Sequence, residues 1–125
     1  MKKANHRINV RTIRNLANNA GMTLQDGYMV TFKTGWQVAL SGAEFDNAED
    51  AMDFVRKLRK MDEMAKKVKD GHNNPCVGIW FSNGIYYIDL SYRYRTKKQA
   101  IEVGQRHNQL SIFSWERKSN PVLFI

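Results

Sequence analysis

Basic side chains gather where the sequence predicts the start of a helix near its C-terminal end. Arg93 and Arg95 lie in the preceding strand, and Lys97 and Lys98 lie in the first turn of the helix. A helix N-terminus favours anions and disfavours cations, because its free amide groups carry partial positive charge. These four residues therefore either bind a phosphate or carboxylate group, or belong to an amphipathic edge strand and a helix start that bear a small cost in stability.

A second basic group lies on a long predicted helix and contains Arg56, Lys57, Arg59 and Lys60. The chain has a net charge of +8, and basic blocks at 1–25, 56–69 and 93–118 surround an acidic block at 26–54. A charge distribution of this kind attracts polyanions, of which nucleic acid is the commonest. The alternative is a basic surface that serves only solubility.

Asp89 is an acidic residue within the otherwise apolar and aromatic strand predicted over residues 85–90. Two interpretations fit it. The carboxylate binds a ligand, or it forms an ion pair with Arg93 or Arg95. The ion pair is the favoured interpretation, because structural pairs are commoner than ligand sites.

Cys76 and His72 are four residues apart, but the pattern around them does not predict catalysis. A cysteine nucleophile needs a base and an orienting group, and no third partner is evident. As zinc ligands they are two where about four are needed, and His6 and His107 lie far away in the chain. The sequence also lacks a phosphate-binding loop and a dinucleotide fingerprint. We therefore expect no catalytic residue, no metal, no cofactor and no enzymatic activity.

Aromatic side chains add a further possibility, since nucleobases stack on exposed aromatic rings. Strand alternation is expected to bury most of the six candidates, which are Trp36, Trp80, Tyr86, Tyr87, Phe113 and Trp115.

Three helices are expected to position these residues. Asn9 caps a helix over 10–20 that Gly21 ends, Asn47 caps a helix over 48–69, and Thr96 caps a helix over 97–107. Turn signals and β-branched or aromatic runs predict strands at 23–25, 28–33, 36–41, 77–81, 85–90, 110–115 and 122–125. Residues 72–75 are expected to be a linker.

The two halves of the chain align without gaps after a shift of 49 positions, which places Gly35 on Gly84. Turn glycines, helix caps and helix core positions coincide, and this pattern predicts an approximate internal ββα duplication. The expected fold class is α+β, with an antiparallel sheet backed by helices. Within a single domain over 1–125, we expect an N-terminal helix at 1–21, a first ββα unit at 22–71, and a second unit with C-terminal strands at 72–125.

The composition is that of a globular protein, with 42% hydrophobic and 26% charged residues among 125. No apolar run approaches the roughly 20 residues of a membrane helix, so no membrane partner is expected. A single cysteine favours a reducing compartment, and we expect a location in the cytoplasm of a bacterial host cell. Exposed strand edges would allow a homodimer through edge pairing.

About half of the chain resembles small accessory proteins encoded by phages and mobile elements. The similar segments are residues 22–24, 30–39, 84–89, 100–101, 104 and 108–113. The resemblance implies a non-enzymatic protein that blocks a host defence system, as anti-CRISPR inhibitors do.

The resulting functional expectation is an anti-CRISPR-like inhibitor that uses its basic surface. Its partner would be a host defence nuclease or ribonucleoprotein, with DNA or RNA as a further partner. A general DNA- or RNA-binding accessory protein is the first alternative. A protein that sequesters a small nucleotide signal, with phosphate at the helix start capped by Thr96, is the second.

Overall fold

An antiparallel sheet with three helices forms the fold of the described chain. The computed structural model describes residues 2–3, 7–25, 27–65 and 75–125. Its helices are α1 (Val10–Arg14), α2 (Ala48–Ala65) and α3 (Lys97–Arg106). Its strands are β1 (Lys2–Lys3), β2 (Ala20–Gln25), β3 (Tyr28–Thr31), β4 (Trp36–Phe45), β5 (Pro75–Ser82), β6 (Ile85–Tyr94), β7 (Ser111–Ser114) and β8 (Val122–Phe124).

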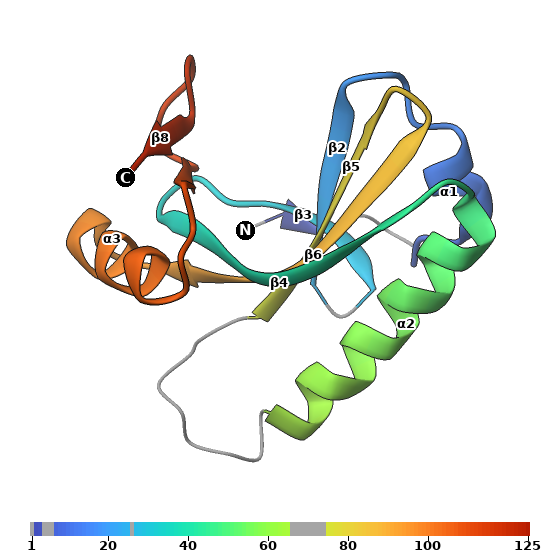
Figure 1. Ribbon diagram of the computed structural model, residues 1–125, viewed down its shortest axis with the longest axis horizontal. Coiled ribbons are helices and arrows are strands. Elements are labelled where there is room, and N and C mark those ends of the chain that lie inside the picture. Colours follow the sequence, from blue (N-terminus) through green and yellow to red (C-terminus); the bar gives the residue numbers. More distant parts are fainter. Residues whose placement is uncertain (1, 4–6, 26, 66–74) are drawn as a thin grey trace.

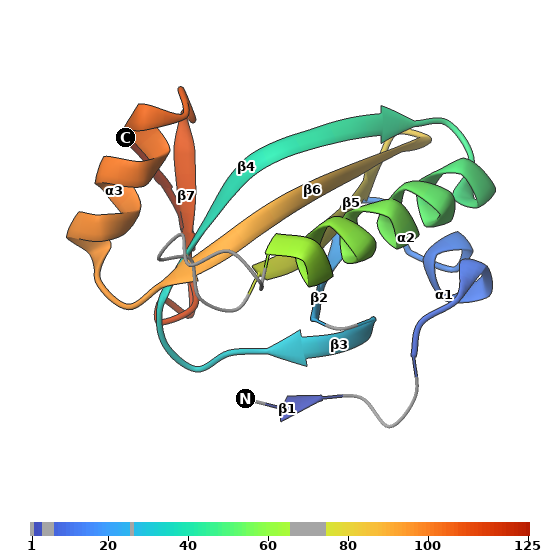
Figure 2. The same cartoon turned by 90° about the horizontal axis from the view of Figure 1, so that it is seen from below.

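The strand order is β1-β3-β2-β5-β6-β4-β7-β8, and every neighbouring pair is antiparallel. Strands β2 to β8 form the seven-stranded main sheet, and the two-residue β1 extends it at the β3 edge. The sheet is strongly curled, and the three helices lie outside the curve (Figure 1, Figure 2). We call the helix-covered side the convex face and the other side the concave face.

Two apolar cores lie on the convex face. The first joins α1 and α2 to the sheet through Ile13, Leu24, Ala51, Val55, Leu58, Val77, Ile79, Tyr86 and Ile88. The second lies under α3 and contains Val38, Tyr92, Tyr94, Ala100, Val103 and Ile112. The amphipathic helices thus cover opposite ends of the same sheet surface, as Figure 2 shows.

Several local predictions from the sequence are confirmed. Asn9 accepts a hydrogen bond from the Thr12 backbone, and Thr96 accepts one from the Gln99 backbone, at the starts of α1 and α3. The Asp50 backbone N–H donates to the Asn47 side chain at 2.8 Å, so α2 is capped as predicted. These short polar caps satisfy amide groups that have no partner within the helix.

The predicted N-terminal helix over 10–20 is too long. Helix α1 ends at Arg14, and Gly21 lies inside β2 rather than after a helix. A turn with Asn19 at a φ of 62° separates the two elements. The backbone N–H of Asn19 donates to the Phe81 carbonyl at 2.8 Å, so pairing with β5 overrides the local helical pattern.

The two predicted ββα units imply a hairpin at Gly35 and another at Gly84. The first is wrong, and the second is confirmed. Strands β5 and β6 pair across Asn83 and Gly84, but β3 pairs with β1 and β2, and β4 pairs with β6 and β7. Both glycines have positive φ, 101° and 80°, which explains their type without requiring the same motif. The ββα duplication is therefore not confirmed, although β4 coincides with β6, and the start of α2 with the start of α3, after the shift.

The predicted end of the long helix and most of the linker lie outside the described residues, at 66–74. The linker prediction is wrong at its last residue, because Pro75 begins β5. The coarse fold class of a mixed α and β protein with an antiparallel sheet is confirmed. No described helix has the length and apolar character that a membrane span requires.

Candidate ligand-binding pocket on the concave face

Strand alternation places a different set of side chains on the concave face. In β6, Tyr86 and Ile88 pack into the convex core, so Tyr87, Asp89 and Ser91 lie on the opposite face. Asp89 pairs in register with Gly78 of β5 on one side and with Gly42 of β4 on the other. The acidic residue is therefore flanked by two residues without side chains, in the middle of the sheet.

The space beside Asp89 depends on these two glycines. A Cβ atom at Gly78 would lie 2.7 Å from both carboxylate oxygens of Asp89, and one at Gly42 would lie 3.3 Å from the Asp89 Cβ. Neither distance is an ordinary van der Waals contact. The Gly42–Asp89–Gly78 row thus forms a notch in the concave face that only glycine neighbours permit.

Asp89 is partly buried and has an unusual protonation equilibrium. Loss of hydration raises the pKa of its carboxyl group to about 6. Hydrogen bonds from the Gly78 backbone and the Ser91 side chain act in the opposite direction and lower the pKa, but they do not offset the burial. A partly ionised carboxylate near neutral pH in a recess is a typical feature of functional sites.

A chain of polar side chains runs along the concave face beside Asp89. The Trp115 indole N–H donates to the Gln37 side-chain oxygen at 2.9 Å. The Gln37 amide nitrogen donates to the Ser91 hydroxyl at 2.9 Å. The Ser91 hydroxyl in turn lies within reach of two acceptors, the Asp89 carboxylate and the Cys76 carbonyl, the latter at 3.5 Å. Side chains from β4, β6 and the segment after β7 are fixed by this chain, which orients the Ser91 hydroxyl and holds Trp115 in the wall.

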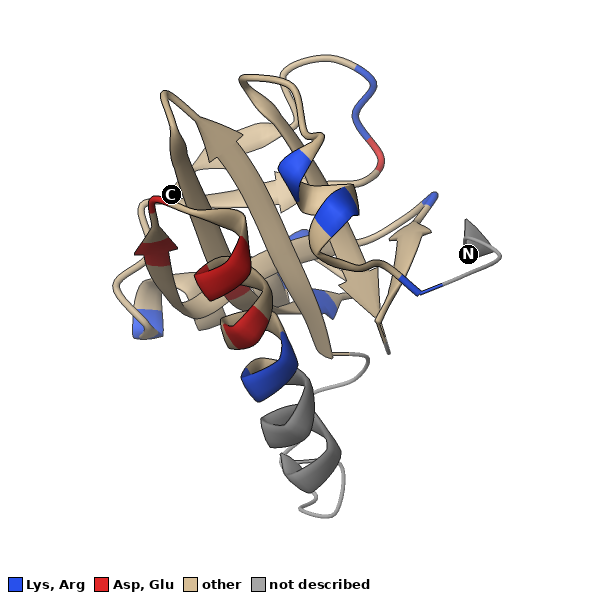
Figure 3. Cartoon of the chain, turned by 90° about the vertical axis from the view of Figure 1, so that its right-hand side faces the viewer, with Lys and Arg blue, Asp and Glu red and all other residues tan. Residues whose placement is uncertain are grey.

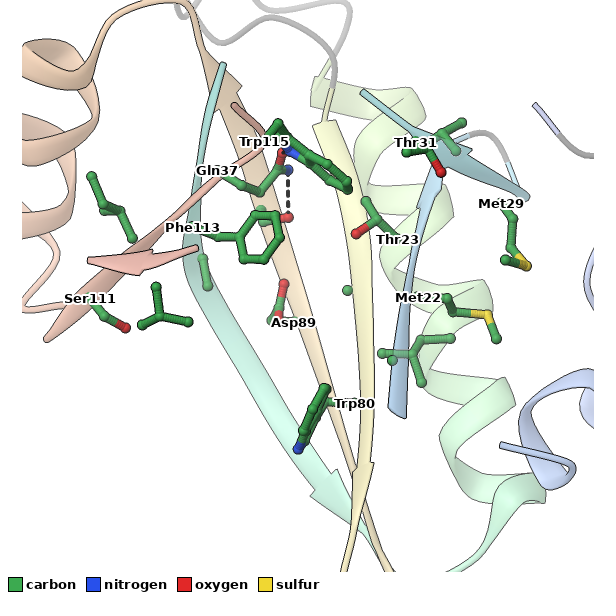
Figure 4. A pocket seen from close by; sticks show the side chains of 18 of the residues that line it. Met22, Thr23, Met29, Thr31, Gln37, Trp80, Asp89, Ser111, Phe113 and Trp115 are labelled. Carbon is green, nitrogen blue, oxygen red and sulfur yellow. Dashed lines mark hydrogen bonds between the residues drawn. The ribbon is translucent and has the colours of Figure 1, made fainter. Parts of the chain in front are cut away.

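These residues line a pocket of about 500 Å³ between the two arms of the curled sheet. Figure 4 shows Asp89 pointing into it, with Phe113 and Trp115 on one side, Thr23 on the other and Trp80 farther along. A small apolar cluster of Val30, Phe32, Cys76 and Trp115 lies near one end of the pocket. Within it, the rings of Phe32 and Trp115 are 5.3 Å apart. At the other side of the Asp89 row, Trp80 remains 46% exposed. The pocket volume of about 500 Å³ lies within the usual range for small-molecule sites.

Asp89 is the only charged residue that lines the pocket among the described residues. The predicted ion pair of Asp89 with Arg93 or Arg95 is wrong. The Arg93 guanidinium donates instead to the Thr34 carbonyl at 2.7 Å and to the Thr34 hydroxyl at 2.8 Å, and it lies over the Phe32 ring. Asp89 thus has hydrogen-bond donors but no cationic partner in the described structure.

The structure separates the basic residues that the sequence grouped together. Arg95, Lys97 and Lys98 are exposed around the start of α3, and the Lys97 ammonium lies 5.9 Å from the centre of the Trp36 ring. Arg93 is only partly exposed, and its contacts with Thr34 tie it to the segment between β3 and β4. The exposed cluster at α3 therefore contains three of the four predicted cations.

The second predicted basic group lies on α2, at the other end of the convex face. Arg56 and Lys57 are exposed, and Arg56 forms an ion pair with Asp53 at 3.0 Å. Figure 3 shows the acidic first turns of this helix followed by basic residues. The backbone of α2 includes Arg59 and Lys60, but their side chains lie outside the described residues.

Cys76 is fully buried, and His72 lies outside the described residues, so the structure does not describe that pair. Among the described residues, no group of three or more His, Cys, Asp or Glu side chains is arranged to hold a metal ion.

Sequence reasoning identified Asp89, Trp80, Phe113 and Trp115 as candidates, and the structure brings these four into one pocket. It did not identify the contributions of Gln37, Ser91, Gly42 and Gly78. The only available signal for Ser91 was its alternation with Asp89 in one strand, and the cross-strand neighbours carried no local signal.

Comparison with known proteins gives no relative for this arrangement. No protein-family model, no curated protein and no solved structure matches the chain.

Proposed function

We propose that the protein is a non-enzymatic binding protein that takes an organic ligand into the concave pocket. The observation that carries this proposal is Asp89, a desolvated carboxylate with no cationic partner, held in a glycine-flanked notch. Leaving a carboxylate so placed costs stability unless another group compensates for the lost hydration. A bound ligand would supply that compensation.

The pocket walls support the same proposal. Trp80, Phe113 and Trp115 provide aromatic surface, and Thr23 lies on the opposite arm. Ligand sites typically combine such walls with a few oriented polar groups. Gln37 and Ser91 provide those groups here, and their mutual hydrogen bond keeps them in place without a ligand.

A fragment library screened by two-dimensional amide and indole NMR spectra tests the proposal. We expect bound fragments to shift the Trp80 and Trp115 indole signals together with the backbone signals of Asp89 and Ser91. Perturbations confined to other parts of the chain, or no perturbation at millimolar fragment concentrations, would contradict the proposal.

Trp80→Ala and Tyr87→Ala form a matched pair for this screen. The two residues are register partners on the same face and are 46% and 39% exposed, but only Trp80 lines the pocket. Trp80→Ala is expected to weaken fragment binding by about tenfold, the equivalent of 1.4 kcal/mol. Tyr87→Ala should leave it unchanged. Equal effects of both changes would show that the binding surface is not this pocket.

A second candidate function comes from the surface of α3. Arg95, Lys97 and Lys98 are exposed, and none of them forms an ion pair with a described residue. This surface supports a role as an inhibitor of a host defence system that handles nucleic acid, which is the role that the resemblance to mobile-element proteins implies. Such a protein would contact nucleic acid directly, or it would bind an acidic face of a nuclease complex.

Salt titration of binding to duplex DNA and to RNA tests the nucleic-acid form of this second candidate. Each phosphate contact contributes a slope of about −0.9 in log affinity against log salt on duplex DNA. We expect the double change Lys97→Glu/Lys98→Glu to weaken binding and reduce the slope. Arg106→Glu, at the far end of the same helix, is the control and should have a smaller effect. If the unmodified protein binds neither nucleic acid at low salt, direct nucleic-acid binding is excluded, and the target of the second candidate function would be a protein.

A further inference from the structure

We propose that the group recognised by the concave pocket is a positively charged nitrogen, an amine or a guanidinium, attached to an apolar or aromatic body. This inference rests on the proposed ligand-binding function and assigns the chemical class of the ligand. Asp89 would be the counter-ion, and the aromatic walls would hold the body.

The charge of the pocket is the first argument. Every other described residue that lines it is neutral, and the nearest basic side chain on the same face of β6, Arg93, is bound to Thr34. An anionic ligand would therefore meet only a negative charge in a desolvated recess. A cationic ligand would meet a carboxylate whose lost hydration it could replace with a charge-assisted hydrogen bond.

The free acceptor capacity of Asp89 is the second argument. An ionised carboxylate offers about four acceptor positions. The Gly78 backbone hydrogen-bonds it, and the Ser91 hydroxyl shares its single proton between this carboxylate and the Cys76 carbonyl. Asp89 lines the pocket, and its register partners Gly42 and Gly78 carry no side chain that could fill its remaining acceptor positions. A primary ammonium or a guanidinium has the donors to fill them.

The position of Trp80 is the third argument. Trp80 lies one row along the concave face from Gly78 and packs over Gly21, where a Cβ atom would lie 2.8 Å from the indole ring. Aromatic rings attract cations within about 6 Å of the ring centre, and indole does so most strongly. A ligand with its nitrogen at Asp89 and its body along Trp80 and Phe113 would use both attractions.

Three compounds with one body and different charges test the inference: 2-phenylethylamine, 2-phenylethanol and phenylacetate. Titrations followed by NMR at pH 7.5 give the dissociation constants. We expect the amine to bind at least tenfold more tightly than the alcohol, and phenylacetate to bind most weakly. The amine could belong to a small molecule or to a lysine side chain of a partner protein. A blocked lysine, Nα-acetyl-lysine methylamide, distinguishes these two sources. It should bind only if the pocket recognises a lysine side chain.

Asp89→Asn is the matched variant, since it keeps the shape of the side chain and removes its charge. It should abolish the preference for the amine over the alcohol, so that the two compounds bind with similar dissociation constants. The unmodified protein gives a second measurement that needs no variant. At pH 5 the carboxyl group with a pKa of about 6 is mostly protonated, so amine affinity should fall about tenfold from its value at pH 7.5.

The outcomes separate the two proposals. If the alcohol shifts the pocket signals but the amine binds no more tightly, the ligand class is wrong and the ligand-binding function stands. A preference for the amine that persists in Asp89→Asn and at pH 5 would also overturn the ligand class. If neither the amine nor the alcohol shifts the signals of Trp80, Asp89 or Ser91, both proposals fail.

Discussion

The two faces of the sheet follow different rules, although the same strands build both. On the convex face, residues such as Ile88 and Val38 are fully buried under helices, and packing explains their type. On the concave face, Asp89 lies next to Ile88 in sequence but faces a pocket, flanked by glycines and linked to Ser91. Packing therefore explains the residue types of the convex face, whereas it does not explain a carboxylate at Asp89 on the concave face.

The largest expected effect on stability comes from a substitution in the core of the convex face. Ile88→Ala should lower the free energy of unfolding by about 2–5 kcal/mol, because it opens a cavity in a close-packed core. Urea denaturation measures this change. Tyr87→Ala is the control on the concave side and should cost much less, since Tyr87 is 39% exposed. Similar losses for the two variants would remove the distinction between the faces.

On the concave face, Asp89 should make the stability of the protein depend on pH. Burial raises the pKa of Asp89 from 3.8 to about 6, so the folded protein binds the proton more tightly than the unfolded chain does. Stability from this group is therefore greatest below pH 4 and is lost as the pH rises to about 6 and above. The total loss is about 3 kcal/mol for a pKa difference of this size.

Denaturation of the unmodified protein and of Asp89→Asn between pH 4 and pH 7 isolates this contribution, because the other groups titrate in both. Relative to the variant, the unmodified protein should lose stability as the pH rises. Parallel stability profiles would mean that Asp89 is hydrated in the folded state, and the concave face would then lose its distinguishing feature.

The glycine notch gives a smaller effect that sharpens the same comparison. Gly78→Ala places a methyl group 2.7 Å from the Asp89 carboxylate oxygens and should cost about 1–3 kcal/mol in unfolding experiments. In the double variant Gly78→Ala/Asp89→Ala the clash is absent, so the two costs should not add. Strict additivity would show that the glycine is required for the backbone rather than for room beside the carboxylate.

Local sequence signals predicted the local parts of the fold. Asn9, Asn47 and Thr96 cap the helices, and Asn83 with Gly84 forms the hairpin, because each of these features depends on a few neighbouring residues. The partners of β3 and β4 depend on contacts between distant segments, for which turn chemistry at Gly35 carries no information. The chain crosses the sheet there instead of reversing within it.

The shift of 49 positions also places Leu40 on Asp89, but the two residues are not structurally equivalent. A bulge between Ala39 and Ser41 shifts the register of β4 against β6, and Leu40 packs in the convex core near α3. The two residues therefore face opposite sides of the sheet, and the apolar type of one says nothing about the other. Asp89 was identifiable as an acid among apolar residues, but its glycine neighbours belong to other strands and became visible only through the register.

The smallest expected effect concerns the start of α3, where the charges do not follow the helix dipole. Helix α2 begins with Glu49 and Asp50, whereas the first turn of α3 contains Lys97 and Lys98 and no acid. Lys98→Glu should raise the free energy of unfolding by about 0.3–1 kcal/mol, because an anion there interacts favourably with the free amide groups. Urea denaturation at low salt measures the gain, which should shrink as salt is added.

Arg106→Glu, in the last turn of α3, is the control and should change stability in the opposite direction, since a cation suits that end. A gain from Lys98→Glu that is accompanied by loss of polyanion binding would mean that the α3 start gives up stability for a contact. The convex face would then carry function at this one place. If Lys98→Glu lowers stability instead, Lys98 has a structural contact that the dipole argument omits, and the convex face is structural throughout its described length.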